Sequence, residues 1–184
     1  MLIFFLKVGE LKEVLRTGWI NKNVKDPENL TEHHFQVAFL AMVLADKLGD
    51  VDKNKLIKMA LIHDMSELIT GDEVIINRWS KKGIKQVEEK HKREREAMTK
   101  IFKGISNSEE YISLFDEFMD RKTLEARILK ELDMLQMCLQ AFEYENKQNI
   151  NLGDFYKYSD PYIKNVEIRK MFNELLKNRE IVVK

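Results

Sequence analysis

His63 and Asp64 form the adjacent pair of side chains best suited to chemistry in this 184-residue chain. They follow the apolar residues 59–62, and a neutral imidazole with a carboxylate is a good ligand set for a divalent transition metal. Adjacent residues of a helix diverge by about 100°. The pair therefore shares one ion only where other segments complete the ligand shell, and the dipeptide alone indicates a metal site weakly.

Two distant residues are candidates for completing that shell. His33 follows Glu32 in the first turn of an expected helix, and Asp133 lies among the apolar neighbours of residues 129–135. An unpaired carboxylate in an apolar environment costs several kcal/mol, which a bound metal would remove. Exposure of Asp133 on a helix face, or an ion pair with Lys130 three residues earlier, is the alternative explanation.

Two other reactive side chains have simpler explanations. His91 lies in the charged run 88–93 and is expected on the surface. Cys138 is the single cysteine, which excludes an intramolecular disulfide and fits a reducing compartment. No basic neighbour in the sequence would activate its thiol, so we expect it in the core.

The elements expected to position these residues are helices. Seven glycines and two prolines are few for a sheet-rich or loop-rich fold, and apolar residues recur at helical spacing. Asn29 or Thr31, and then Asp52, are expected helix N-caps, and residues 74–76 are the only fragment with strand character. The pattern predicts one all-α domain over residues 1–184 with six or seven helices, near residues 4–15, 29–48, 53–69, 84–103, 108–118, 122–147 and 161–178.

The composition excludes several classes of protein. Apolar residues make up 44% and charged residues 34% of the chain, which fits neither a disordered tail nor a membrane protein. The 31 basic and 31 acidic side chains balance, so no net field draws the chain to nucleic acid or to an anionic membrane. Lys7 interrupts the apolar residues 1–6 too early for a signal peptide. We therefore expect a cytoplasmic protein without a nucleic-acid or membrane partner.

The candidate ligands resemble the pattern of the HD-domain phosphohydrolases, which is a lone histidine, a His-Asp pair and a distant aspartate, all on helices. In this sequence these are His33, His63-Asp64 and Asp133. Within that superfamily the chain is similar to the 5'-deoxynucleotidase branch, the YfbR-like and HD domain-containing protein 2-like enzymes. The similarity runs through residues 15–19, 27–28, 32–33, 61–67, 70–72, 88–90, 96–98, 132–133 and 139–145.

The resemblance implies a single HD-domain helical bundle that binds a divalent cation (Mn, Co, Fe, Ni, Zn or Mg). The implied ligands are His33, His63, Asp64 and Asp133. Because the family ligand directly follows an acidic residue, the pattern selects His33 rather than its neighbour His34. The implied reaction removes the 5'-phosphate of deoxyribonucleoside monophosphates, with the ion lowering the pKa of a water and polarising the phosphate.

The resemblance also assigns roles around the ion. Glu67 would orient or deprotonate the attacking water, or protonate the leaving alkoxide, unless it forms an exposed salt bridge on its helix. Arg16 would bind the phosphate through its planar guanidinium group. Trp19 would pack on the nucleotide or steer its phosphate, and without the family match it would be interpreted as a core anchor.

Asp72, Glu73 and Ile75 belong to a segment that borders the substrate in the family. The family usually continues the Gly-Asp step with an apolar residue and then a proline, whereas here Glu73 follows Asp72 and no proline is near. Asp72 would accept a hydrogen bond from the 3'-hydroxyl and leave little room for a 2'-hydroxyl. The alternatives are an ordinary turn residue, or one that holds an additional ion together with Glu67.

Two other functions are compatible with the same residues. One is an HD phosphohydrolase acting on a cyclic nucleotide, a guanosine polyphosphate or a triphosphate, although no basic cluster adjoins the ligand motifs in the sequence. The other is a non-catalytic metal or nucleotide sensor. The family implies a homodimer, and the last expected helix has an apolar face that would serve either a partner or the core, formed by Ile163, Val166, Met171 and Leu175.

Overall fold

The structure is all-helical, as the sequence predicts. The computed structural model describes residues 1–75, 78 and 80–182, and the one strand-like pairing in this part is an isolated bridge between Leu15 and Asn29. The α-helices described are α1 (Leu2–Gly9), α2 (Thr17–Ile20), α3 (Leu30–Leu44), α4 (Lys53–Ile62), α5 (Glu67–Thr70), α6 (Lys81–Ile101), α7 (Ser108–Asp120), α8 (Leu124–Gln148), α9 (Gly153–Ser159) and α10 (Val166–Val182). Three 3₁₀ helices accompany them, Glu10–Glu13, Ala45–Lys47 and Asp160–Tyr162.

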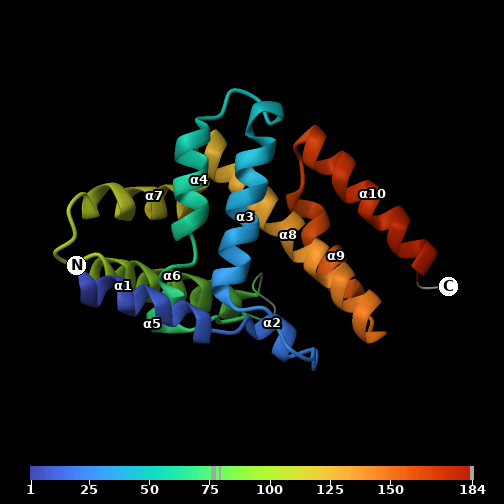
Figure 1. Cartoon of the computed structure of the whole chain (residues 1–184), viewed down its shortest axis with the longest axis horizontal. Coiled ribbons are helices and arrows are strands. Elements are labelled where there is room, and N and C mark those ends of the chain that lie inside the picture. Colours follow the sequence, from blue (N-terminus) through green and yellow to red (C-terminus); the bar gives the residue numbers. More distant parts are fainter. Residues whose placement is uncertain (76–77, 79, 183–184) are drawn as a thin grey trace.

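Helix α8 is the centre of the bundle. It packs against α3, α4, α7, α9 and α10, and it runs obliquely across α3 and α4, which lie side by side (Figure 1). Because neighbours surround it, α8 buries residues on several faces, and five of them are polar, among them Asp133 and Gln136. The bundle therefore brings α3, the end of α4 and the middle of α8 to one place.

The start of α3 is fixed by a capping box. The side chain of Asn29 accepts a hydrogen bond from the Glu32 N–H at 3.0 Å, and the Glu32 carboxylate accepts one from the Asn29 N–H at 2.9 Å. Of the two caps that the sequence allows, Asn29 is the one used. His33 consequently stands at the start of α3, where its side chain is fully buried.

The helix expected over residues 53–69 breaks after Ile62, which corrects the sequence-based prediction. The Nδ1–H of His63 donates to the carbonyl oxygen of Ala60 at 2.8 Å. In a continuous helix that carbonyl would accept the main-chain N–H of Asp64, so the side chain competes with the helix ladder. A tight turn follows, and α5 begins at Glu67 and ends where Gly71 adopts a φ of 73°.

Other boundaries also differ from the prediction. The first helix, expected near residues 4–15, ends at Gly9 and continues only as a 3₁₀ helix. A separate short helix, α2, then begins at Thr17. Helices α2 and α9 have only four and seven residues. Segments this short show no clear helical period, so the hydrophobic pattern of the sequence does not predict them. Val74 and Ile75 form no strand, and residue 76 lies outside the described part.

The last helix begins at Val166 rather than at Pro161, which lies in a 3₁₀ helix. The Glu131 carboxylate accepts the N–H groups of Lys164 and Asn165, each at 2.6 Å, and so holds the chain before the helix starts. The apolar side of this segment mostly faces α8 and belongs to the core. No helix of the described residues is long and apolar enough to span a membrane.

Candidate metal centre and substrate cavity

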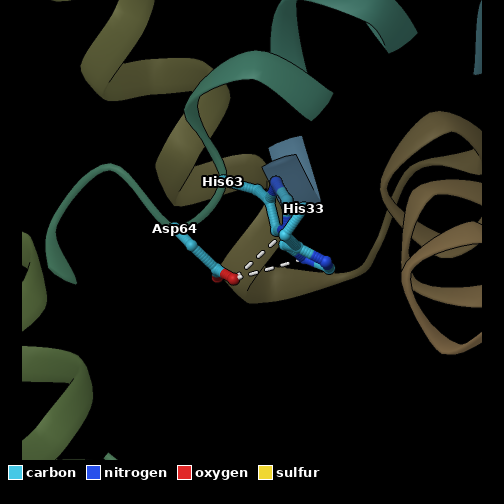
Figure 2. Close-up of side chains that lie close together, drawn as sticks. All are labelled: His33, His63 and Asp64. Carbon is cyan, nitrogen blue, oxygen red and sulfur yellow. Dashed lines mark hydrogen bonds and ion pairs between the residues drawn. The ribbon is translucent and has the colours of Figure 1, made fainter. Parts of the chain in front are cut away.

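The side chains of His33, His63 and Asp64, which come from α3 and from the turn after α4, lie close together (Figure 2). One ligand atom from each lies within 4.8 Å of the others. The two imidazole Nε2 atoms are 3.3 Å apart, and the Asp64 Oδ2 atom lies 3.7 Å from Nε2 of His33 and 3.4 Å from Nε2 of His63. Both imidazoles are buried. The break after α4 places His63 and Asp64 here, opposite the first turns of α3.

The hydrogen bonds of the two imidazoles define which nitrogen carries the proton. Nδ1 of His63 faces the Ala60 carbonyl, and Nδ1 of His33 lies 2.7 Å from the Gln136 Oε1 atom, so both must donate. A neutral ring then has its lone pair on Nε2. Burial lowers the pKa of His63, which favours the neutral ring. With both rings in the neutral form, the two Nε2 lone pairs face each other across 3.3 Å.

Asp133 supplies a further oxygen from α8. Its Oδ2 atom accepts from the Lys130 ammonium group at 2.7 Å, while its Oδ1 atom lies 3.4 Å from Nε2 of His33. The Oδ1 atom is buried and has no hydrogen-bond partner. Although burial opposes ionisation, the Lys130 ammonium group holds the pKa of Asp133 well below its ordinary value. Asp133 therefore pairs with Lys130 through Oδ2 and keeps Oδ1 without a hydrogen bond.

His33, His63 and Asp64 fit a divalent cation, and Asp133, which is not one of these three converging residues, adds an oxygen beside His33. Nitrogen and oxygen ligands about 2.0–2.2 Å from one ion are roughly 3–3.5 Å apart, close to the separations of the Nε2 and Oδ atoms. Two facing lone pairs and an orphaned carboxylate oxygen repel one another unless a positive charge lies between them. The orphaned Oδ1 atom of Asp133 is the observation that supports including Asp133 in the ligand set.

The candidate centre opens into a cavity of about 730 Å³, a size suited to a small-molecule ligand. Its wall contains every residue that the sequence proposes for catalysis or substrate binding. The wall also includes six cationic side chains that come from distant segments of the sequence. They are Arg16, Lys22, Arg78, Lys90, Arg121 and Lys130. The absence of a basic cluster in the sequence was therefore misleading about the cavity.

Glu67 is buried in the cavity wall at the start of α5. Its Oε1 atom lies 3.4 Å from the Lys90 ammonium group, and its Oε2 atom has no hydrogen-bond partner. Burial, and then the charges of Asp64 and Asp72, raise the pKa of Glu67 well above its ordinary value, whereas Lys90 lowers it. A carboxylate with one free oxygen and a raised pKa suits proton transfer near neutral pH.

Arg16 joins Asp64 to Asp72. Its Nη1 atom donates to the Asp64 Oδ2 atom at 2.9 Å, and its Nε atom is 3.9 Å from the Asp72 Oδ2 atom. The Asp72 Oδ2 atom also accepts from the main-chain N–H of Thr17 at 2.7 Å. The turn after α5 therefore folds back onto the start of α2 and holds Asp72 over the cavity.

The other proposed residues have different surroundings. Trp19 is 1% exposed and donates from Nε1 to the Glu28 carboxylate at 2.9 Å, so it is a core residue whose ring also lines the cavity. Glu73 forms an ion pair with Arg93 near the surface, and Ile75 lies in the cavity wall. His34 lies outside the ligand cluster, but its buried ring is 5.0 Å from the His63 ring.

Sequence reasoning missed Gln136, Glu28 and Lys90 as parts of the site. Glu28 and Lys90 fall within the motifs of the resemblance but received no role. Gln136 follows Asp133 by three residues and so lies on the same face of α8. This spacing was the one signal that marked it.

Comparisons with known proteins agree with this geometry. Residues 8–174 match the HD domain family. The mouse protein named 5'-deoxynucleotidase HDDC2 is 37% identical over 179 residues, which cover 95% of this chain and 86% of that protein. The solved structure of a conserved hypothetical protein from Pyrococcus furiosus superposes with a TM-score of 0.79 at 29% identity, covering 96% of this chain and 99% of that one.

A second similar structure belongs to a protein whose name states an activity. A predicted metal-dependent phosphohydrolase from Magnetospirillum magnetotacticum superposes with a TM-score of 0.74 at 26% identity, covering 96% of this chain and 89% of that one. The fold and the metal-ligand cluster define an all-helical protein with a histidine and carboxylate centre. The chain belongs to the HD domain family.

Proposed function

We propose that this protein is a metal-dependent 5'-deoxynucleotidase, which hydrolyses the 5'-phosphate of deoxyribonucleoside monophosphates. The observation that carries the proposal is the convergence of His33, His63 and Asp64, with the orphaned oxygen of Asp133 beside them, on a cavity of nucleotide size. The relatives named 5'-deoxynucleotidase, at up to 37% identity over nearly the whole chain, support the choice of substrate.

A divalent cation held by these four residues would polarise the phosphate and lower the pKa of a bound water. Residues of the chain bind the phosphate and accept the proton. Arg16 is held by Asp64 and directs its remaining N–H groups to phosphate oxygens. The free Oε2 atom of Glu67 accepts the proton of the attacking water, and Lys90 opposes the rise that burial causes in the pKa of that carboxylate. No nucleophilic side chain is required.

Asp72 would select the sugar. Its carboxylate is fixed by the Thr17 N–H and lies in the cavity wall, where it accepts a hydrogen bond from the 3'-hydroxyl. A 2'-hydroxyl placed beside it without a partner would cost roughly 1–3 kcal/mol. Glu73, Ile75 and the Trp19 ring would border the nucleoside.

Phosphate release is the test of this function. The protein is stripped with a chelator, reloaded with Mn, Co, Fe, Ni, Zn or Mg, and assayed on ribonucleoside and deoxyribonucleoside 5'-monophosphates. We expect release from deoxyribonucleotides with at least one metal and little release from ribonucleotides. The Glu67→Gln protein, prepared in parallel, serves as the blank for contaminating phosphatases. A protein that releases no phosphate from any of these substrates with any of these metals would contradict the proposal.

The cationic lining of the cavity favours a second candidate, a polyphosphate substrate. Arg16, Lys90 and Lys130 each pair with a carboxylate of the site, which leaves less charge for extra phosphates. The panel therefore includes deoxyribonucleoside triphosphates and cyclic nucleotides. Faster turnover of either class than of monophosphates would replace the substrate while keeping the metal centre.

We further propose a cytoplasmic homodimer. Exposed apolar side chains gather on α1 and on one face of α3, and an exposed apolar patch is typical of an interaction surface. They are Leu2, Ile3, Phe5, Leu6, Phe35, Phe39, Met42 and Val43. Light scattering after size exclusion should give twice the chain mass for the parent. The double change Phe35→Ser and Phe39→Ser should give the single mass, and a monomeric parent would contradict the proposal.

A further inference from the structure

Glu28 is a motif residue to which the proposed reaction assigns no role, yet it lies at the hub of a buried polar network. Its Oε1 atom accepts from Trp19 Nε1 at 2.9 Å, and its Oε2 atom accepts from Gln136 Nε2 at 3.0 Å. Its main-chain N–H donates to the Tyr144 hydroxyl at 2.7 Å, and its carbonyl accepts from the Arg16 N–H at 3.0 Å. Glu28 is only 4% exposed, so these contacts fix it firmly.

The network continues from Glu28 to His33 through Gln136, which is fully buried. A carboxylate only accepts hydrogen bonds, so the Gln136 amide must turn its NH₂ group toward Glu28. That NH₂ group also donates to the Gln36 Oε1 atom at 3.1 Å. The Gln136 Oε1 atom then faces Nδ1 of His33 at 2.7 Å and accepts its proton. Glu28 thereby determines which way the amide points.

We propose that Glu28 and Gln136 are positioning residues that set the tautomer of His33. With the proton held on Nδ1, the lone pair on Nε2 points at the metal centre before any cation arrives. A Gln136 amide turned the other way would present its NH₂ group to Nδ1. It would then favour the opposite tautomer, in which Nε2 carries the proton and cannot bind a metal. This inference rests on the proposed function, because it needs His33 to be a ligand. Partners of this kind typically contribute 10–100-fold to metal affinity.

Glu28 also connects the metal centre to the cavity wall. The same carboxylate that orients Gln136 holds the indole of Trp19, whose ring packs against Phe155 at a centroid distance of 4.2 Å. A change at Gln136 should therefore disturb the metal ligand alone. A change at Glu28 should disturb both the metal ligand and the wall that borders the substrate. This difference separates a positioning role from general damage to the core.

The first test compares Gln136→Met with the matched control Gln140→Met. Methionine has a similar volume but offers neither the acceptor for His33 nor the donor for Glu28. Gln140 lies one turn further along α8 and is also buried, so its change reproduces the cost to the helix. Chelator competition on the metal-free proteins should give a metal Kd that is weaker by about 10–100-fold for Gln136→Met only. At saturating metal the KM should stay within about twofold of the parent.

The second test observes the tautomer directly and needs no metal and no activity. Nitrogen-15 NMR of histidine-labelled, metal-free protein distinguishes a proton on Nδ1 from one on Nε2. The parent and Gln140→Met should show His33 protonated on Nδ1, and Gln136→Met should show a large fraction protonated on Nε2. The Glu28→Gln protein should show the same change, with a weaker metal Kd and a raised KM, because one amide cannot accept from both Trp19 and Gln136.

Parental metal affinity together with a His33 proton on Nδ1 in Gln136→Met and Glu28→Gln would overturn the inference. Weaker binding in the control Gln140→Met, to the same degree as in Gln136→Met, would also overturn it. A parent protein that binds no divalent cation would contradict the proposed function instead. In that event the NMR comparison still tests whether Gln136 orients His33.

Discussion

The two halves of the site are built by different means. The imidazole half, His33 in α3 and His63 directly after α4, is buried and has each Nδ1 atom fixed by a hydrogen bond to an uncharged carbonyl oxygen. The cavity half consists of the carboxylates Glu67, Asp72 and Glu73, and it is held mainly by ion pairs with Lys90, Arg16 and Arg93.

This difference assigns different tasks to the two halves. Buried hydrogen bonds to uncharged groups hold a ligand in one orientation regardless of pH, as a metal centre requires. Ion pairs in a solvent-accessible cavity rearrange when an anionic substrate arrives, because the substrate competes for the same cations. We therefore expect changes in the first half, or at the carboxylate ligands Asp64 and Asp133, to remove the metal. Changes in the second half should leave the metal bound and alter turnover, pH dependence or selectivity.

The largest effect is expected from removing a ligand. His63→Ala or Asp133→Ala should lose bound metal and activity together, and activity should fall to the level of the buffer blank. Elemental analysis after reloading checks the metal content. Asp46→Ala, which changes an exposed aspartate, is the control and should bind a full complement. Full metal occupancy in either ligand variant would show that the ligand set is wrong.

Glu67→Gln should separate chemistry from metal binding. The amide keeps the shape of the side chain but cannot accept the proton of water, so kcat should fall by about 10²–10⁴-fold with the metal retained. Glu94→Gln is the matched control, since Glu94 also pairs with Lys90. The control should retain most of the activity. A Glu67→Gln protein within a few-fold of the parent would leave Glu67 a structural residue.

Asp72→Ala should keep the metal and lose most of the activity. Its remaining kcat/KM should prefer deoxyribose over ribose about tenfold less than the parent does, which corresponds to one lost hydrogen bond in the cavity. Asp72→Asn preserves an acceptor for the Thr17 N–H and so controls for collapse of the turn. Parental rate and parental preference in Asp72→Ala would exclude a role in reading the sugar.

Lys90→Met should give the smallest effect, a shift in pH dependence. The ammonium group lowers the pKa of Glu67, which burial, Asp64 and Asp72 raise. Removing it raises that pKa further, so a larger fraction of Glu67 is protonated at a given pH. As a base, Glu67 is active above its pKa, and the acidic limb of the kcat profile should move to higher pH. An acidic limb at the parental position would show that Lys90 does not tune Glu67.

The sequence allowed prediction of the all-helical class and of the N-caps Asn29 and Asp52, because helical periodicity and capping are local. It did not reveal the break after Ile62, which depends on the side chain of His63 competing for the Ala60 carbonyl. Helix α9 is too short to show a period, and the start of α10 depends on Glu131, far away in the chain.

The candidate site was predictable in its residue types and only partly in its contacts. The His-Asp pair and the lone His33 are recognisable by pattern, and the structure brings them together. For Asp133 the sequence left two alternatives, a metal ligand or an ion pair with Lys130. In the fold Asp133 pairs with Lys130 through one oxygen and keeps the other oxygen without a hydrogen-bond partner. The cationic lining of the cavity comes from separate segments, and no single window of sequence shows it.

In the proposed reaction, the substrate phosphate binds at the ion held by His33, His63, Asp64 and Asp133. The most direct measurement is phosphorus-31 electron–nuclear double resonance on the Mn-loaded Glu67→Gln protein, mixed with the deoxyribonucleoside 5'-monophosphate that the parent hydrolyses best. The account predicts a phosphorus coupling of the size seen for a phosphate oxygen bound directly to manganese. Bound manganese and bound nucleotide without any phosphorus coupling would contradict it.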